Sequence, residues 1–290
     1  MGDDKSEALR AWAAARWPRV DWTGAEVRQG AFHQVVLSRG APIMRGAVGN
    51  GHPARSAREA AIARVVAGLG LTTAVPSVLD GPLGDEHMTA ILISRVPGVH
   101  GADRDWNTDL AVEYQRLLDQ LTGVDTSRLE VLPEVRSWCG GQRWPEIVQE
   151  VTVPLPRRLR ALADRLVAAV LDVEADQPGA LVHGDFGPHN VLWDDGRAVS
   201  LIDFDHACVA DRAIDVAPLI GVYGAAAVAE MVDEPLLTRA MHHRATLSLQ
   251  VACGAHLIGE GELRDFALSN YVSRAAAGLL HDPAGATPGG

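Results

Sequence analysis

The spacing of hydrophobic residues changes from the period of strands to the period of helices near residue 100. Before that point, short β-prone runs bounded by turn residues cover 25–29, 33–37, 42–45, 75–79 and 88–94, and such runs predict strands. Two stretches of the same region, 7–17 and 58–69, have apolar residues at helical spacing. The first hundred residues therefore predict a small sheet with two helices.

From about Trp106 onward the pattern is helical. Apolar residues recur on one face over 110–121, over 155–170 and in further stretches up to 280. Pro97 and Gly98 interrupt the pattern between the two regions, which is typical of a connector. We therefore predict two units, residues 1–97 and residues 98–290, and a disordered tail over 282–290, which is rich in proline and glycine.

The most specific pattern in the chain is a β-hairpin predicted within 183–205. Asp195-Gly196 separates two β-prone runs, and this dipeptide is a strong signal for a two-residue turn with positive φ. Such a turn places Asn190 opposite Leu201 and makes Asp203 its diagonal neighbour on the same face, within about 7–8 Å. We therefore expect Asn190 and Asp203 to share one ligand.

The residue types at this hairpin favour a hard cation. Mg²⁺ typically takes one or two carboxylate or amide oxygens, while substrate phosphates and waters fill its other positions. Asp185 stands five residues before Asn190, on the loop that enters the hairpin, where its carboxylate can accept a hydrogen bond from an incoming hydroxyl. An acid, an amide and a second acid in this order form the catalytic loop and metal-binding acid of kinases.

The stretch His183–Asp185 with Asn190, followed by Ile202–Asp205, resembles the aminoglycoside phosphotransferases, the small-molecule branch of the protein-kinase-like fold. The resemblance implies an α+β, two-lobed fold with a small antiparallel-sheet N-lobe for the nucleotide and a larger, mainly helical C-lobe. It implies MgATP-dependent phosphorylation of a hydroxyl, with Asp185 as the catalytic residue and Asn190 and Asp203 as the Mg²⁺ ligands. It also implies that Asp215 braces the catalytic loop.

The same resemblance assigns nucleotide-binding residues in the N-terminal unit. Gly30 falls in the first turn of the sheet, which covers the phosphates in kinase-like folds. Arg45 ends the third strand and replaces the usual lysine, since Lys5 is the only lysine in the chain. Glu59 lies on the apolar face of its helix, where a carboxylate needs a cation, so we expect it to pair with Arg45.

The connector supplies the remaining part of the predicted nucleotide site. In the resembled family the backbone of this hinge pairs with adenine, which assigns Ser94 and Val96 to ATP binding. The glycine-rich stretch 46–51 is neither a P-loop nor a dinucleotide fingerprint, because no lysine follows it and the βαβ context is missing.

Charge and the run Gly30–Val36 bear on the substrate. The net charge is −11, from 26 basic against 37 acidic residues, which argues against nucleic acid or an anionic membrane as a partner and suits a cationic substrate. The run Gly30–Val36 with Arg45 is similar to the viomycin and capreomycin phosphotransferases, which modify cationic peptide antibiotics. We therefore expect an enzyme that inactivates such an antibiotic or an aminoglycoside; a macrolide or a small metabolite is an alternative acceptor.

Three cysteines without a paired spacing, and the lack of an apolar run of signal or membrane-span length, indicate a cytoplasmic protein. The sequence sets no oligomeric state. The irregular stretch 137–144 carries Trp138 and Trp144, which either pack in a core or line a pocket.

Two other classes of function fit parts of the pattern. A dinuclear metallohydrolase would use imidazole and carboxylate ligands and would release phosphate from a phosphoester without ATP. Its candidate ligands are His183, Asp185, His189, Asp203 and His206. A non-catalytic nucleotide-binding module, motivated by the missing lysine, would bind ATP without turnover.

Overall fold

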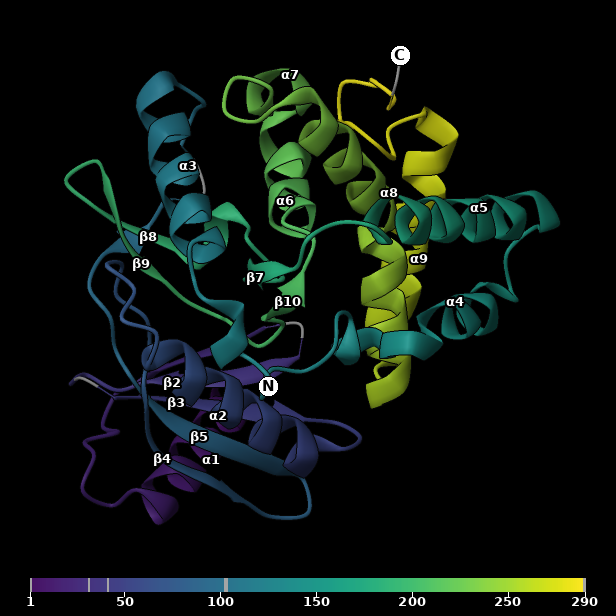
Figure 1. The fold of residues 1–290 in the computed structure, drawn as a ribbon. Helices are drawn as coiled ribbons and strands as arrows, with labels where there is room; N and C mark the ends of the chain where they lie inside the picture. Colours follow the sequence, from purple (N-terminus) through teal and green to yellow (C-terminus); the bar gives the residue numbers. More distant parts are fainter. Residues whose placement is uncertain (1, 31, 41, 102–103, 289–290) are drawn as a thin grey trace. The chain divides into compact units, whose positions relative to one another are not determined.

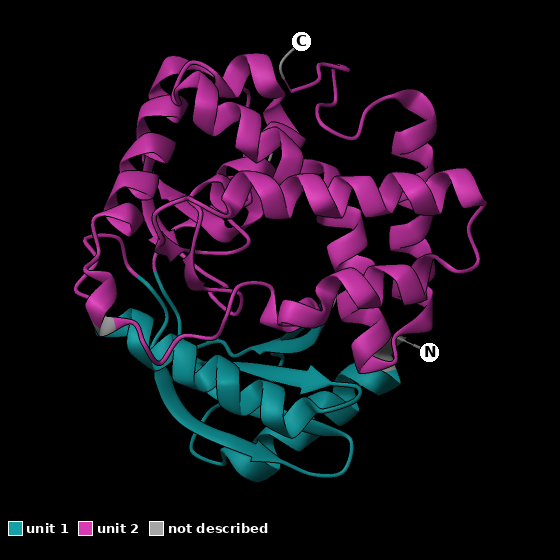
Figure 2. Ribbon diagram, turned by 45° about the vertical axis from the view of Figure 1, so that its right-hand side comes forward, with its two compact units in different colours: residues 1–68, 75–96 teal, residues 69–74, 97–290 magenta. Residues whose placement is uncertain are grey.

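The computed structural model describes residues 2–30, 32–40, 42–101 and 104–288. They form two compact units, unit 1 (1–68 and 75–96) and unit 2 (69–74 and 97–290), coloured separately in Figure 2. Ala31, within the run that resembles the viomycin and capreomycin enzymes, lies outside the described residues. The last two residues of the predicted disordered tail, Gly289 and Gly290, also lie outside them.

Unit 1 is built on a five-stranded sheet in the order β1-β2-β3-β5-β4, and all its neighbouring strands are antiparallel. The predicted small antiparallel sheet is confirmed. Its elements are α1 (Gly2–Arg16), β1 (Glu26–Gln29), β2 (His33–Leu37), β3 (Pro42–Val48), α2 (His52–Ala67), β4 (Val78–Gly84) and β5 (Met88–Ser94).

β4 differs from its prediction. The sequence predicts a strand that ends at residue 79, but β4 continues through the turn-like residues to Gly84. It does so with register shifts against β5 between Val78 and Asp80 and between Asp80 and Leu83. Irregular pairing of this kind gives room to residues that disfavour a regular strand.

The two helices of unit 1 use different faces of the sheet (Figure 1). Trp17 follows α1 and packs with Trp22, Val36 and Met44 in one core. Arg45 follows Met44 in β3, so its side chain points to the opposite face, which is the face that α2 covers with Glu59. One face of the sheet therefore carries an apolar core, and the opposite face carries the polar side chains of Arg45 and Glu59.

Unit 2 is mainly helical, as predicted. Figure 1 shows α8 and α9 side by side, with α5 crossing them. The helices are α3 (Thr108–Thr122), α4 (Trp144–Thr152), α5 (Arg157–Glu174), α6 (Ala213–Tyr223), α7 (Ala225–Val228), α8 (Glu234–Ile258) and α9 (Gly261–Ala277). Short 3-10 turns lie at Thr126–Arg128, Ser137–Cys139, Gly141–Arg143 and Pro188–Asn190. The strands are β6 (Val99–His100), β7 (Ala180–Val182), β8 (Val191–Asp194), β9 (Arg197–Leu201) and β10 (Cys208–Ala210).

The core of unit 2 forms around α8. Trp144 of α4, Val170 of α5, Leu249 of α8 and Tyr271 of α9 are buried together in it. Helices packed on several sides explain why α8 buries residues around most of its circumference. No helix in the described part of the chain combines the length and the apolar character needed to cross a bilayer.

The central hairpin of unit 2 forms as predicted at its tip but not along its length. Asp195 and Gly196 both have positive φ, 44° and 80°, as a primed turn requires. An irregularity at Leu192 then shifts the register by one residue. The N–H of Ile202 consequently donates to the carbonyl of Asn190 at 3.0 Å. The predicted pairing of Asn190 with Leu201 is therefore wrong by one position, and so is the prediction that Asp203 is the diagonal neighbour of Asn190 on the same face. A bulge cannot be read from the alternation alone.

The C-terminal tail is ordered where it begins. Asp282 is 1% exposed, and its carboxylate accepts hydrogen bonds from the N–H groups of Ala225 at 2.6 Å and Ala284 at 2.9 Å. The predicted disorder is therefore wrong at this residue. A buried carboxylate that caps the first turn of α7 holds the tail to the domain.

Candidate active site

The loop after β7 is braced by α6. Asp215, in the first turn of α6, accepts hydrogen bonds from the backbone N–H of His183 at 2.7 Å and of Gly184 at 2.9 Å. Burial raises the pKa of Asp215 to about 7, although both hydrogen bonds act in the opposite direction. The expected bracing contact is confirmed.

His183 links this loop to the segment that carries Asp203. Its Nε2 lies 2.8 Å from the carbonyl of Ile202 and donates to it, and its Nδ1 accepts from the backbone N–H of Asp185 at 3.3 Å. Burial lowers the pKa of His183, so the ring is neutral near pH 7. Both ring nitrogens are engaged within the protein, which argues against His183 as a metal ligand.

Asp185 is held by two side chains of its own loop. Its Oδ2 accepts a hydrogen bond from Asn190 Nδ2 at 3.1 Å and lies 3.4 Å from His189 Nε2. Burial alone would raise the pKa of Asp185, but the His189 hydrogen bond and neighbouring imidazoles hold it well below its ordinary value. The same hydrogen bond to Asp185 raises the pKa of His189. Asp185 is therefore an ionised acceptor with a fixed orientation.

Gly187 allows the imidazole of His189 to lie against Asp185. A Cβ built at Gly187 would lie 2.3 Å from the imidazole of His189, closer than any side chain allows. Gly187 therefore leaves room for the ring to fold back onto Asp185. The sequence pattern offers His189 as a candidate metal ligand and gives no sign of this contact with Asp185.

Asn190 and Asp203 fit a magnesium ion by their chemistry. Asn190 is 3% exposed, and its Nδ2 donates to both the carbonyl and the carboxylate of Asp185, so its Oδ1 is the atom that remains for a cation. Asp203 is exposed and has a φ of 67°, an unusual conformation for a residue other than glycine that is common at functional sites. One amide oxygen and one carboxylate are ligands that Mg²⁺ accepts.

In unit 1 the predicted phosphate-binding residues gather around a third side chain. Glu59 is 4% exposed; its Oε1 lies 3.0 Å from His33 Nε2, and Arg45 Nη2 lies 3.2 Å from His33 Nδ1. Arg45 is the predicted cation for Glu59, and in the structure both side chains contact His33. The alternation of residues along the strands could have indicated this contact, because His33 and Arg45 fall on the same face of neighbouring strands.

Gly30, Ser94 and Val96 lie at the ends of strands. The N–H of Gly30 donates to the carbonyl of His33 at 2.8 Å and closes the turn between β1 and β2. Ser94 ends β5, and its Oγ accepts from the backbone N–H of Ser77 at 2.9 Å. Val96 is half-buried at the end of unit 1. Their nucleotide contacts stay a prediction.

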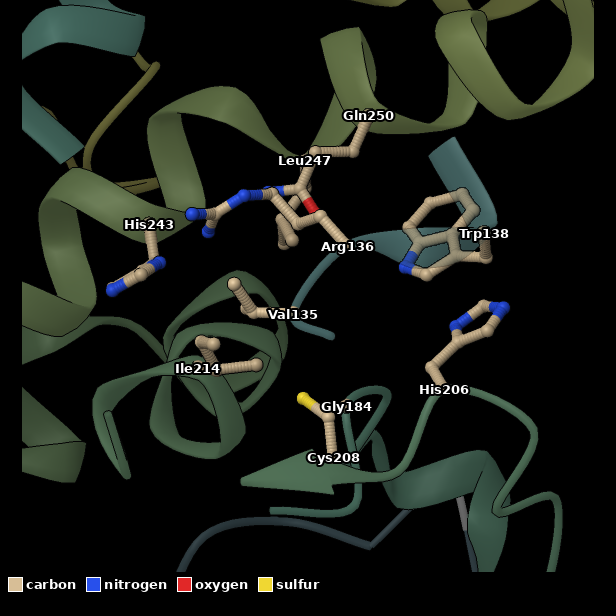
Figure 3. A pocket seen from close by; sticks show the side chains of 10 residues that line it. All are labelled: Val135, Arg136, Trp138, Gly184, His206, Cys208, Ile214, His243, Leu247 and Gln250. Carbon is tan, nitrogen blue, oxygen red and sulfur yellow. The ribbon is translucent and has the colours of Figure 1, made fainter. Parts of the chain in front are cut away.

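A pocket in unit 2 lies beside the loop that carries Asp185 (Figure 3). At one end the rings of Trp138 and His206 are stacked, with centroids 4.3 Å apart and planes 8° apart, and His243 lies at the other end. Gly184, the residue before Asp185, is part of the lining. Trp138 thus lines a pocket, whereas Trp144 is fully buried in the core.

Together, this fold and an acid, amide and acid on one loop and hairpin define a kinase-like phosphotransferase. Residues 43–244 match the family model described as the phosphotransferase enzyme family, APH, and the chain belongs to this family. The predicted family, fold class and type of enzyme are confirmed.

A curated relative covers nearly the whole chain. The viomycin phosphotransferase of Streptomyces vinaceus is 29% identical over an aligned region of 274 positions, and the match covers 86% of this chain and 92% of the relative.

Solved structures share the fold at low identity. The GDP complex of wild-type aminoglycoside 2'-phosphotransferase-IIIa has a TM-score of 0.73 at 15% identity and covers 94% of this chain and 99% of its own. The macrolide 2'-phosphotransferase MphH from Brachybacterium faecium has a TM-score of 0.61 at 22% identity, with 91% and 97% covered. Nucleotides are bound in several of these similar structures, as GDP, ATP or ADP.

Proposed function

We propose that this protein transfers the γ-phosphoryl group of MgATP to a hydroxyl of a cationic antibiotic of the viomycin and capreomycin type, and so inactivates it. The observation that carries the proposal is the fixed, ionised carboxylate of Asp185. Asn190, five residues later, donates its side-chain nitrogen to Asp185, so that its oxygen is left for a metal ion. The relative that covers 86% of the chain is a viomycin phosphotransferase, which supports this substrate class.

In the proposed reaction, unit 2 supplies the groups that act on the hydroxyl. Asp185 accepts a hydrogen bond from the acceptor hydroxyl, orients it in line with the γ-phosphorus, and takes its proton late in the transfer. Asn190 and Asp203 would hold Mg²⁺, which neutralises charge on the phosphates when bound. Asp215 keeps the loop in place through two backbone hydrogen bonds.

Unit 1 supplies the proposed nucleotide contacts. Arg45 would neutralise the phosphate chain, and the turn at Gly30 would cover it with backbone N–H groups. The backbone at Ser94 and Val96 would pair with adenine. Structures with the same fold contain nucleotides, which supports ATP as the donor.

We further propose that the pocket beside Gly184 receives part of the acceptor. The flat faces of Trp138 and His206 suit a planar group, such as a guanidinium or a conjugated amide. A net charge of −11 favours the approach of a cation. The proposal includes neither a nucleic acid nor a membrane as a partner. The three free cysteines are buried thiols, which agrees with a reducing cytoplasm.

A macrolide or an aminoglycoside is the second candidate acceptor, because structures of enzymes for both classes share the fold. The metallohydrolase alternative is disfavoured by family membership and by the two engaged nitrogens of His183.

The test is a mass measurement on the antibiotic. The purified protein is incubated with MgATP and, separately, viomycin, capreomycin, kanamycin, streptomycin and a macrolide. We expect the mass of one phosphate to be added to viomycin or capreomycin, with one ADP released per modified molecule. Modification of the macrolide or of an aminoglycoside, with viomycin and capreomycin unchanged, would assign the second candidate. ATP binding without modification of any compound would overturn the proposal.

A further inference from the structure

His33 connects the two charged residues of unit 1. Its Nε2 lies 3.0 Å from Oε1 of Glu59, and its Nδ1 lies 3.2 Å from Nη2 of Arg45. The side chains of His33 and Glu59 are only 12% and 5% exposed. A buried carboxylate, an imidazole and a guanidinium thus follow one another in a continuous chain of polar contacts.

The register of the sheet sets this geometry. The turn closed by Gly30 starts β2 at His33. His33 is paired with Ala47 and Val35 with Arg45, so His33 and Arg45 are diagonal neighbours on one face of two antiparallel strands. This is the face that carries Glu59 of α2. A one-residue slip in either strand would move one of the two side chains to the opposite face.

Hydrogen-bond chemistry selects one form of the His33 ring. A carboxylate can only accept and a guanidinium can only donate. Neutral imidazole satisfies both partners when Nε2 carries the proton toward Glu59 and the Nδ1 lone pair accepts from Arg45. We assign this tautomer from its partners.

An arginine needs such a partner more than a lysine does. An ammonium is a point charge that can rotate, whereas a guanidinium is a planar fork whose direction decides which oxygens it can bind. The bond to His33 uses one of the five N–H donors of Arg45 and fixes the plane of the fork. This requirement arises because the only lysine of the chain, Lys5, lies outside the sheet.

We propose that His33 is a positioning residue that transmits the orientation set by Glu59 to Arg45, so that the arginine meets the phosphates of the nucleotide at a fixed angle. A Glu59–His33–Arg45 relay thereby sets the direction of the cation that stands where kinases have a lysine. The inference rests on the proposed function for the identity of its ligand, MgATP, but not for the identity of the acceptor.

The experiment measures nucleotide binding without any antibiotic. MgADP and adenosine are titrated calorimetrically into the full-length wild type, His33→Ala, Arg45→Ala and the double variant. We expect His33→Ala to weaken MgADP binding about tenfold, the loss typical of a charge-assisted hydrogen bond, and to leave adenosine binding unchanged. When Arg45 is already alanine, His33→Ala should cause no further loss of MgADP affinity, because the relay acts through the arginine.

Three controls separate the relay from simpler explanations. His87→Ala removes a histidine of the same unit whose side chain is 84% exposed, and it should leave both affinities unchanged. His33→Gln keeps a donor for Glu59, and His33→Asn keeps an acceptor for Arg45. Each should lose part of the MgADP affinity while keeping the fold, so they carry the test if the alanine variant does not fold.

The outcomes distinguish the relay from the proposed function. Unchanged MgADP affinity in the His33 variants, or an equal loss with and without Arg45, would overturn the relay. Arg45→Ala with normal MgADP affinity would also overturn it, because the arginine would then not meet the phosphates. If the wild type binds MgADP with the expected pattern but modifies no antibiotic, the proposed function fails and the relay stands.

Discussion

The carboxylate of Asp215 lies 2.7 Å from the backbone nitrogen of His183 and binds the next N–H as well. This buried acid fixes the start of the loop that carries Asp185, although the two residues belong to different elements, 30 positions apart in the chain. In Asp215→Asn the side-chain NH₂ group would face one of the two backbone N–H groups, of His183 or Gly184, and that N–H would lose its acceptor. We expect Asp215→Asn to lower the free energy of unfolding by about 1–3 kcal/mol, the cost of one unsatisfied buried group.

The same residue gives a pH dependence with a defined sign. The pKa of Asp215 is raised from 3.8 to about 7 in the folded protein, so between these values the folded state holds a proton that the unfolded state has released. Stability from this group is present below pH 4 and falls as the pH rises to about 7. The free energy of unfolding of the wild type and of Asp215→Asn can be measured with urea at pH 5 and at pH 7.5. We expect the wild type to exceed the variant by less at pH 7.5 than at pH 5. The same difference in free energy at both pH values would contradict the raised pKa.

Asp203 should set the magnesium requirement of the reaction. It is exposed and follows the residue paired with Asn190, so its loss removes a ligand without opening a core. We expect Asp203→Ala to raise the Mg²⁺ concentration for half-maximal ADP release at least tenfold, and Asp203→Asn, which keeps an oxygen but no charge, to raise it less. Asp194→Asn, an exposed acid on the same hairpin, is the control. An unchanged requirement in Asp203→Ala would remove Asp203 from the metal site.

Trp138 should affect the acceptor and not the nucleotide. Its ring stacks on His206 at the edge of the pocket, and stacking of a planar ligand group, such as a base, on an aromatic side chain is typically worth about 1–3 kcal/mol. We expect Trp138→Ala to raise the KM for the antibiotic about tenfold, with the KM for ATP unchanged. Trp106→Ala, which removes a half-buried tryptophan of unit 2 outside the pocket, should change neither value. Equal effects on both substrates would indicate a general loss of structure.

The sequence predicted most of the elements because their signals are local. Asp195-Gly196 needs only two residues with positive φ to form its turn. The site residues of unit 2 were predicted as a set, because Asp185, Asn190 and Asp203 lie within a single loop and hairpin. Their spacing along the chain already limits their separation in space.

The features that the sequence did not predict arise from tertiary packing or from irregular strand pairing. The bulge near Leu192 moved the partner of Asn190 by one residue, and alternation of residue types carries no trace of such a shift. Asp282 is held by Ala225, 57 positions away, so a composition typical of disorder could not reveal it. His33 was not predicted, because a buried carboxylate such as Glu59 indicates a cation as its partner and does not indicate a neutral ring between the two.

The most direct test of the account is the rate of phosphoryl transfer by Asp185→Asn. Asparagine keeps the size of the side chain and an oxygen for Asn190, but it cannot take the proton of the hydroxyl. In a single-turnover experiment with MgATP and viomycin, we predict a rate about 10²–10⁴-fold below wild type, with MgADP affinity unchanged within twofold. A variant that transfers phosphate at the wild-type rate would contradict the role of Asp185 and, with it, the proposed mechanism.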